Sequence, residues 1–264
     1  MDFELNQKLE KICSENLKKK ISTTEIKFYK KNLSVSYNNL GIIHKNLGDY
    51  KKALDYHFRC MKIREELGDK NGIGTSLINI GNVYQINGDY VKAIDYYTRC
   101  LKIKEQTGDK RSAAGALNNI GNVYLIQGDY DKALEYQTRG LKIQNEIGDK
   151  LGSSLTLSNL GVISKNKGDT SASLSYYEQS LAIENELGDL FGASSSLNNI
   201  GLIYYYRGQI PEAEKYFNQS LEIGEKIQDK QGIAISLSNM GLIHKQKGDY
   251  NKAIDFHQSA LKLS

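Results

Sequence analysis

The sequence holds one proline, three cysteines and no tryptophan, and it has no run of 18 apolar residues. Three cysteines cannot all pair with one another, which argues against a disulfide framework. The missing apolar run argues against a membrane-spanning helix. The first residues also lack the basic-then-apolar order of a secretory signal peptide. We therefore predict a cytoplasmic protein with no membrane partner.

The net charge is also small, at +4 over 264 residues. A balance so near neutrality does not predict the continuous basic surface of a nucleic-acid binder, and we expect no nucleic-acid partner. Only residues 171–225 are clearly biased, with eight acids against two basic residues. The hydrophobic fraction of 39% is low for one spherical core and fits a thin, elongated core better.

What the sequence has in abundance is repetition, at a period of 40 residues without insertions. The first glycine column comprises Gly41, Gly81, Gly121, Gly161, Gly201 and Gly241. The second comprises Gly48, Gly88, Gly128, Gly168, Gly208 and Gly248. An aromatic column comprises Tyr56, Tyr96, Tyr136, Tyr176, Tyr216 and Phe256. A fixed period of this length predicts a solenoid or a propeller.

Each unit of 40 residues is expected to form two helices joined by tight turns. Apolar residues recur at spacings of three and four in residues 70–87 and again in residues 90–106. Between these segments, Gly88-Asp89 and Gly108-Asp109 supply a left-handed helix end followed by an N-cap. The alternating strand patterns of a propeller blade are missing. The sequence therefore predicts a helical solenoid, and Pro211 falls in a first helical turn, where it is tolerated.

The pattern of small and large residues resembles that of tetratricopeptide repeats. The matching residues are Leu40-Gly41, His44 or Tyr84, Gly48, Ala53, Cys60 and Tyr97. The 40-residue form, as in the segment 117–124, most resembles G-protein-signalling modulators, kinesin light chains and bacterial peptide-pheromone receptors. The usual late proline and early tryptophan are missing. This resemblance implies an all-α, right-handed superhelical α-solenoid of six helix pairs with an N-terminal capping helix.

We predict two parts in the chain. Residues 1–33 form the cap helix and the start of the first repeat helix, and residues 34–264 form six repeats. The repeat boundaries are 34–73, 74–113, 114–153, 154–193, 194–233 and 234–264. Leu5, Leu9, Ile12 and Ile21 suggest an amphipathic cap helix, and Ser22 with Glu25 predicts a capping box at the next helix.

One column is asparagine in every repeat, although asparagine costs roughly 0.5 kcal/mol relative to alanine inside a helix. Its members are Asn39, Asn79, Asn119, Asn159, Asn199 and Asn239. These amides either bind the main chain of an extended peptide or lock neighbouring helices together. We favour peptide binding, because the similar families use an asparagine at this position for main-chain contact with bound peptides.

Further candidates for peptide binding follow on the same helical face. They are Asn82, Asn122, Ile86, Leu125, Ile126, Tyr205 and Tyr206. Backbone contacts would supply affinity, and these side chains would select the ligand. Ordinary packing is the alternative for the apolar ones. A chaperone carboxylate clamp is not expected, because asparagine fills the column where the clamp needs arginine.

Other columns favour structural roles. Arg59, Arg99 and Arg139 each lie four residues after an acid, which predicts exposed intrahelical ion pairs. Cys60 and Cys100 occupy a column of small residues, which predicts buried structural thiols. We expect the four histidines, at the positions of Tyr84 and Tyr97 in the repeat, to pack as aromatics rather than bind metal. No phosphate loop or nucleophile motif is present, so we predict no enzymatic activity and no cofactor.

The leading hypothesis is a non-catalytic scaffold that holds an extended segment of a partner protein or peptide in a groove. The alternative is a regulatory, sensor or oligomerisation module of a larger signalling protein. A pheromone-receptor phosphatase is not favoured, because residues 1–33 are too short for its helical bundle. In the last helix we expect Ala253, Ile254, His257, Ala260, Leu261 and Leu263 to meet water. Such a face predicts weak self-association through the C-terminal repeat.

Overall fold

The structure is a computed structural model that describes residues 3–19 and 21–263. These residues form thirteen α-helices and no strand, which confirms the all-α prediction. The helices are α1 (Phe3–Asn16), α2 (Thr23–Asn46), α3 (Tyr50–Glu66), α4 (Lys70–Ile86), α5 (Tyr90–Thr107), α6 (Lys110–Gln127), α7 (Tyr130–Glu146), α8 (Lys150–Asn166), α9 (Thr170–Leu187), α10 (Leu190–Tyr206), α11 (Ile210–Ile227), α12 (Lys230–Gln246) and α13 (Tyr250–Leu261). None of the described helices is both long and apolar enough to cross a membrane.

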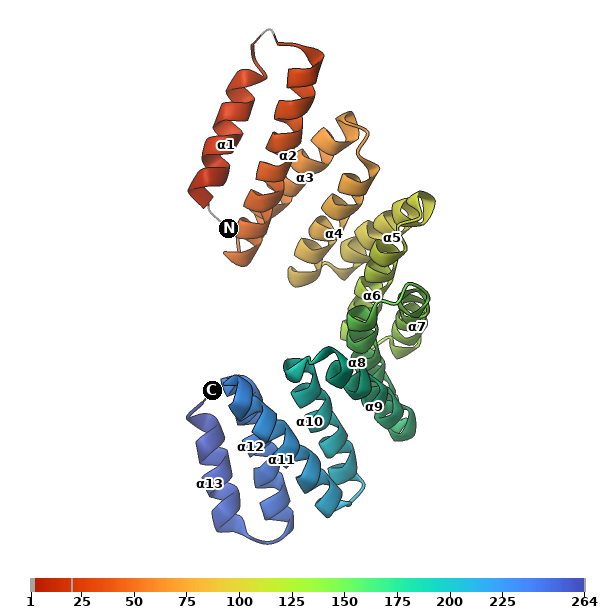
Figure 1. The fold of residues 1–264 in the computed structure, drawn as a ribbon, viewed down its shortest axis with the longest axis vertical. Coiled ribbons are helices and arrows are strands. Elements are labelled where there is room, and N and C mark those ends of the chain that lie inside the picture. Colours follow the sequence, from red (N-terminus) through yellow and green to blue (C-terminus); the bar gives the residue numbers. More distant parts are fainter. Residues whose placement is uncertain (1–2, 20, 264) are drawn as a thin grey trace. The chain divides into compact units, whose positions relative to one another are not determined.

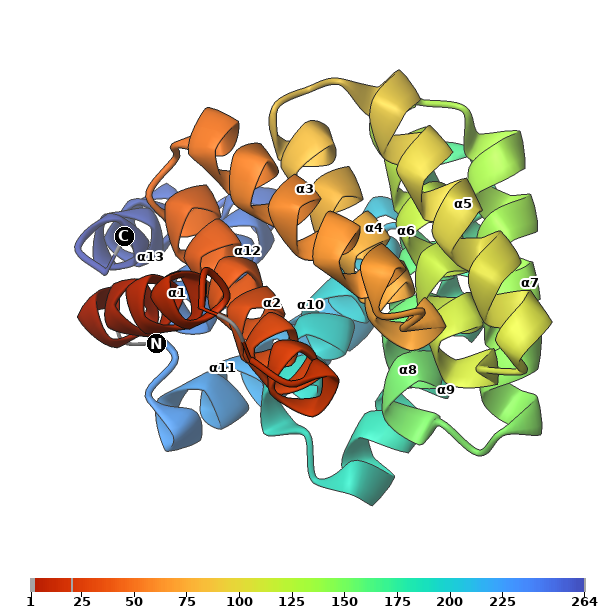
Figure 2. The same cartoon turned by 90° about the horizontal axis from the view of Figure 1, so that it is seen from above.

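From α2 onward, consecutive helices pair and run antiparallel (Figures 1 and 2). We call the first helix of each pair the A helix (α2, α4, α6, α8, α10 and α12) and the second the B helix. The A helices α2, α4, α8, α10 and α12 pack on their own B helices, and α4, α6, α10 and α12 also pack on the B helix before them. In addition, α2 contacts α4, and α10 contacts α12. This is the adjacent-pair packing of a tetratricopeptide solenoid, as predicted. Its right-handed course stays a prediction.

The chain divides into two compact units, Met1–Ile143 and Gln144–Ser264. In the first unit the largest buried cluster includes Leu77, Tyr97 and Ile120. In the second unit, buried clusters lie around Tyr177 with Ile200 and around Phe217 with Met240. Each unit therefore has its own core between A and B helices. The repeat boundaries predicted from the sequence remain a proposal.

The helices begin and end where the Gly-Asp pairs predict. Asp89 accepts a hydrogen bond on Oδ1 from the backbone N–H of Lys92 at 3.2 Å, and Gly88 before it has φ of +80°. A glycine pays little for this left-handed conformation. The end of α11 differs, because Gln228 stands there at φ of 57°. Asp229, the N-cap of α12, also makes no side-chain capping bond.

The first glycine column is explained by close helix packing. A Cβ atom at Gly81 would lie 2.6 Å from Tyr97 Cε1, and one at Gly201 would lie 2.5 Å from Phe217 Cε1. Both rings are fully buried. Glycine therefore lets the aromatic ring of the B helix lie directly on the A-helix backbone.

The N-terminal helix α1 packs differently from the prediction. Leu5 and Ile12 are 61% and 52% exposed, whereas Asn6 and Cys13 are buried. The reason is polar: the carbonyl of Asn6 accepts a hydrogen bond from Ser36 Oγ at 2.6 Å. This bond turns the Asn6 side of α1 toward α2. The capping box is confirmed, since Ser22 Oγ accepts from the Glu25 N–H and Glu25 Oε2 accepts from the Ser22 N–H.

The last helix partly corrects the expectation for the C-terminal face. Ala253 and Ala260 are buried, because their small side chains pack against α12. His257 is exposed, Leu263 is half-buried, and Ile254 and Leu261 are 53% and 77% exposed. Fewer residues of this face are therefore exposed than the sequence predicted.

The cysteines are free and buried, which confirms the predicted structural thiols. Burial raises the pKa of the Cys100 thiol to about 11. This thiol is therefore protonated at neutral pH, in the form that packs as a small apolar group.

Candidate functional site

The asparagine column lies on the A helices, and three of its members bond to the preceding part of the stack. Asn79 Nδ2 donates to Asn38 Oδ1 at 2.9 Å, and Asn239 Nδ2 donates to Asn198 Oδ1 at 3.1 Å. Asn39 Nδ2 donates to Asn6 Oδ1 of α1 at 3.1 Å. Asn6 thus takes the place that Asn38 has one repeat later. These bonds support the helix-locking role that the sequence left open.

The same bonds leave capacity for a ligand. An amide has two N–H donors and two acceptor lone pairs, and each bond above uses only one donor of the column residue. Asn39, Asn79, Asn119, Asn159 and Asn199 are half-buried, and Asn239 is buried. Peptide binding by this column therefore stays a prediction that is compatible with the observed bonds.

A buried polar network extends from the column in the second unit. Asn198 Nδ2 lies 2.7 Å from Ser220 Oγ of α11 and 3.0 Å from Ser236 Oγ of α12. Ser236 Oγ also lies 3.1 Å from Ser220 Oγ. Three helices are therefore tied together by side chains that are hydrogen-bonded although buried, as folding requires.

Asn82 and Asn122 reach toward their own B helices. Tyr97 Oη donates to Asn82 Oδ1 at 2.6 Å, and Gln137 Nε2 donates to Asn122 Oδ1 at 2.7 Å. Burial raises the pKa of Tyr97, so its hydroxyl remains a donor. These amides are half-buried and already serve the A–B contact.

The predicted apolar ligand contacts lie in the last turns of A helices. Ile86, Ile126 and Tyr206 are 54%, 55% and 75% exposed, whereas Leu125 and Tyr205 are half-buried. The rings of Tyr205 and Tyr206 meet edge to face, with centroids 5.5 Å apart. The exposed side chains are available to a partner, and their role in binding remains a prediction.

Sequence reasoning missed a second group of exposed apolar residues, in the first half of the A helices of the second unit. Leu151, Leu155, Phe191 and Ile235 are 54%, 60%, 62% and 47% exposed. Leu155 lies four residues before Asn159, so both are on one helical face. The signal was present in the repeat columns. At the position of Leu151 and Phe191 the first unit has Lys31, Asn71 and Arg111. At the position of Leu155 it has Val35, which is 45% exposed, and then Thr75 and Gly115.

His44 and His244 pack as aromatics, each on a ring of its own B helix. His44 stacks on Tyr56, with centroids 5.4 Å apart, and Tyr84 stacks on Tyr96 at 5.5 Å. The residue one position later on the B helix, His57 or Tyr97, lies beneath the glycine instead. Burial lowers the pKa of His57 to about 4. Among the described residues, no cluster of three or more potential metal ligands exists.

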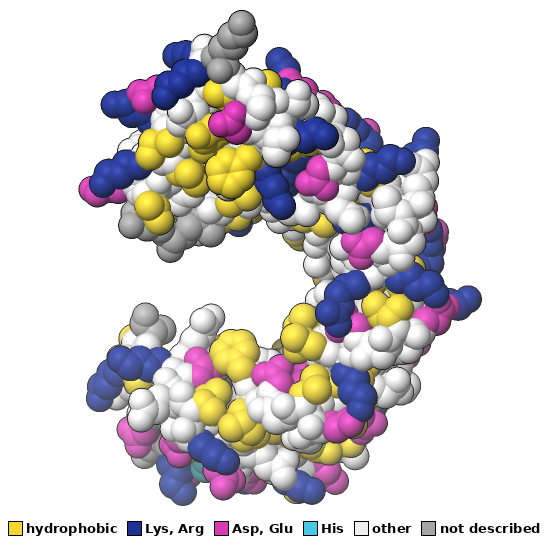
Figure 3. All heavy atoms as spheres, turned by 45° about the horizontal axis from the view of Figure 1, so that its top comes forward, with side chains coloured by type: hydrophobic (Ala, Val, Ile, Leu, Met, Phe, Trp, Pro, Cys, Tyr) yellow, Lys and Arg dark blue, Asp and Glu magenta, His cyan; other side chains and the backbone are white. Residues whose placement is uncertain are grey.

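Charged residues on the B helices serve the fold. Arg59 pairs with Asp55 at 2.8 Å, and Arg139 pairs with Glu135 at 3.6 Å, which confirms the predicted intrahelical pairs. Buried Lys104 lies 2.8 Å from Asp109, and this bond holds the pKa of Asp109 at about 2. Charged side chains of both signs are interspersed over the visible face, with hydrophobic side chains between them (Figure 3).

The repeated helix pairs and the glycine contacts define a helical repeat protein. A family model described as tetratricopeptide repeat matches residues 32–106, 112–186 and 192–264. The chain belongs to the tetratricopeptide repeat family. Repeats of this family are protein-interaction modules and are generally non-catalytic. No curated protein sequence matches the chain significantly.

Solved structures share the fold at low sequence identity. A signal-transduction ATPase with a tetratricopeptide repeat sensor from Pyrococcus horikoshii is 16% identical, with a TM-score of 0.76 over 98% of this chain and 42% of that one. The repeats of a putative kinesin light chain from Podosopora anserina are 18% identical, with a TM-score of 0.60 over 74% and 96%. The apo form of RapI is 13% identical, with a TM-score of 0.69 over 96% and 88%.

Proposed function

We propose that the chain is a non-catalytic scaffold that binds an extended segment of a partner protein across its A helices. The observation that carries this proposal is the exposed apolar group beside the asparagine column. Leu155 and Phe191 are 60% and 62% exposed on neighbouring A helices of one unit. Large apolar side chains gathered on one face usually mark a contact surface.

The asparagine column supplies the complementary polar chemistry. An extended peptide presents a row of unpaired backbone N–H and C=O groups, and side-chain amides can bond to both. Half-buried amides such as Asn119 and Asn199 lose little water when a peptide covers them. Apolar side chains beside them would then select the sequence of the segment. A cytoplasmic location is part of this proposal.

A specific comparison favours a second candidate function. The Pyrococcus horikoshii neighbour carries its tetratricopeptide repeats as a sensor, and this chain matches 42% of that protein. By analogy, the repeats would be a regulatory module of a larger signalling protein. The binding surface would be the same, but its occupant would control a neighbouring domain.

The test first selects peptides that bind the full chain. The selected peptides are then labelled with a fluorophore, and their affinity for the chain and its variants is measured by titration. Exchanging Leu155 and Phe191 for Asp, or Ile126 for Asp, is expected to weaken binding at least tenfold, because desolvated apolar anchors dominate interfaces. The control is Arg99→Ala with Arg139→Ala, which removes only exposed ion pairs and is expected to change affinity less than twofold. The reverse ranking would place the binding surface on the B helices.

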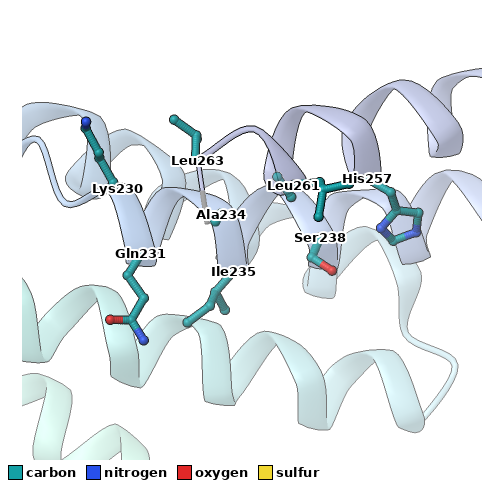
Figure 4. Close-up of a pocket in the computed structure, with 9 residues that line it drawn as sticks. Lys230, Gln231, Ala234, Ile235, Ser238, His257, Leu261 and Leu263 are labelled. Carbon is teal, nitrogen blue, oxygen red and sulfur yellow. The ribbon is translucent and has the colours of Figure 1, made fainter.

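Self-association is the second interaction that we propose, through a hollow of about 630 Å³ between α12 and α13 (Figure 4). Its lining includes Ile235, Leu261 and Leu263. One repeat earlier, the equivalent surface is covered by α12 through the bonds of Ser236 and Asn239 to Asn198. The hollow therefore has the form that receives an A helix, and a second copy could fill it weakly.

A further inference from the structure

Carboxylates are distributed very unequally between the two kinds of helix. The A helices α4, α6, α8, α10 and α12 contain no Asp or Glu, although they hold seven Lys and Arg residues. The B helices contain sixteen Asp and Glu residues, and most other acids are N-caps between helices. At the average frequency of the chain, these five A helices would contain about ten acids.

Helix formation does not explain this exclusion. Glutamate is among the better helix formers, and acids are favoured in the first turn of a helix. The lysines in the repeat column of Lys150 have a structural explanation, since Lys30 within α2 pairs with Glu66 at 2.7 Å and Lys150 in the first turn of α8 pairs with Glu186. These ion pairs explain why lysine is present at this position. They do not explain why the rest of each of these five A helices contains no Asp or Glu. The exclusion therefore concerns the surface that the A helices present.

Two lysines on this surface have no such partner. Lys165 of α8 and Lys245 of α12 occupy the same repeat position in the last turn, and both are exposed. Within the described part of the chain, neither forms an ion pair. They flank Tyr205 and Tyr206 on α10, which lies between their helices in the chain.

We infer that the A-helix surface selects a segment that carries Asp or Glu among apolar residues. The inference rests on the proposed function and names the chemistry of its ligand. An acidic segment meets no like charge on α4, α6, α8, α10 and α12, whereas carboxylates there would repel it and cost affinity. Lys165 and Lys245 supply the opposite charge.

The arrangement along the A helices adds a pattern to this chemistry. Leu155 and Lys165 are ten residues apart on α8, which corresponds to about 15 Å along the axis. An extended segment that crosses the helices points alternate side chains in opposite directions. One set meets the apolar residues of the first helical half, and the other meets the lysines of the last turn. The ligand is therefore an alternating apolar and acidic segment.

The apolar half distinguishes this surface from a nucleic-acid site. A phosphate backbone needs closely spaced basic residues, but α10 has no Lys or Arg along its length. Its exposed residues Phe191 and Tyr206 instead offer apolar contact. The occupant is a polypeptide.

The test uses the full chain and a random 12-residue peptide library. Recovered peptides are sorted by competition, and those weakened by Leu155→Asp with Phe191→Asp are assigned to the A-helix surface. We expect this set to be enriched in Asp and Glu. Replacing these acids by Asn and Gln in a recovered peptide is expected to weaken binding about tenfold at low salt and less at high salt, where charges are screened.

Charge-reversal variants then locate the effect. Lys165→Glu with Lys245→Glu is expected to weaken the acidic peptide at least tenfold. The matched control, Lys226→Glu with Lys262→Glu, makes the same charge change in the last turn of α11 and at the C-cap of α13, and is expected to change affinity less than twofold. Circular dichroism checks that both variants fold.

The outcomes separate the two proposals. Peptides that bind the A-helix surface without enrichment in acids overturn this inference and leave the proposed function intact. A library that yields no peptide sensitive to Leu155→Asp and Phe191→Asp overturns the proposed function itself. Displacement of a bound peptide by a 20-nucleotide single strand of mixed sequence, abolished by the Lys165 and Lys245 changes, overturns the choice of a polypeptide.

Discussion

Ser180 donates a hydrogen bond from Oγ to Glu184 Oε1 at 2.8 Å within α9, and the Glu184 side chain belongs to a residue that is only 3% exposed. Oε2 of this carboxylate has no hydrogen-bond partner in the described structure. One repeat earlier the same position is Gln144, whose Oε1 accepts from Thr156 Oγ1 at 2.8 Å. The fourth repeat thus buries a carboxyl group where the third buries a neutral amide.

Glu184→Gln is expected to stabilise the protein at neutral pH, by about 1–2 kcal/mol, because a buried and poorly paired group is removed. Burial, and secondarily the nearby charge of Asp189, raise the pKa of Glu184 in the folded state. The folded protein therefore binds a proton on Glu184 more tightly than the unfolded chain does. The contribution of this proton binding to stability is present at low pH and is lost as pH rises through the folded-state pKa of Glu184. Thermal melts at pH 4 and pH 7 should show a larger gain at pH 7. An equal gain at both values would contradict the assignment.

Asn79→Ala and Asn119→Ala are expected to change the free energy of unfolding by different amounts, but to weaken peptide binding alike. Asn79→Ala loses the bond to Asn38, worth about 1 kcal/mol, and regains about 0.5 kcal/mol of helix propensity. Asn119 makes no side-chain hydrogen bond among the described residues, so its replacement should be neutral or slightly stabilising. Both should weaken a peptide that bonds to the column. Urea unfolding and peptide titration measure the two effects, and unchanged affinity in both variants would leave helix locking as the only role.

Gly81→Ala is expected to destabilise the first unit by about 2–4 kcal/mol, because the added methyl would meet the Tyr97 ring at 2.6 Å. Gly115→Ala in α6 is the matched control, since no atom lies within 4 Å of its added Cβ. That change should stabilise by up to about 1 kcal/mol through helix propensity. Denaturant unfolding of the two variants compares them directly. Similar effects would mean that the glycine column does not mark close packing.

Ile254→Lys combined with Leu261→Lys is expected to reduce self-association, because Leu261 lines the proposed hollow and Ile254 is exposed on the same helix seven residues earlier. Sedimentation velocity over a range of concentrations measures the shift. Leu5→Lys with Ile12→Lys, at the exposed face of α1, is the control and should leave association unchanged. A strict monomer at high concentration in the unchanged protein would remove the basis for the prediction.

The period of 40 predicted the helices and their turns well, because Gly-Asp pairs fix the ends locally and the glycine column lets a B-helix side chain lie directly on the A-helix backbone. What it could not predict depended on contacts between helices. On α1, the carbonyl of Asn6 accepts a hydrogen bond from Ser36 while Leu5 and Ile12 stay exposed, and a backbone atom leaves no trace in a side-chain pattern. Leu155 and Phe191 were missed because periodicity draws attention to columns that stay the same, whereas a ligand is selected by those that change.

The left-handed Gln228 has a consequence for how the stack comes apart. A residue with a Cβ pays about 1 kcal/mol in this conformation where the other turns have glycine. The following cap, Asp229, makes no side-chain bond, and Gln209 at the start of α11 makes none either. In a solenoid each repeat is stabilised only by its neighbours, so a weak junction sets where opening begins. The pair α12 and α13 therefore forms the segment that unfolds first, and its amide protons exchange with solvent ahead of those in α8 to α10.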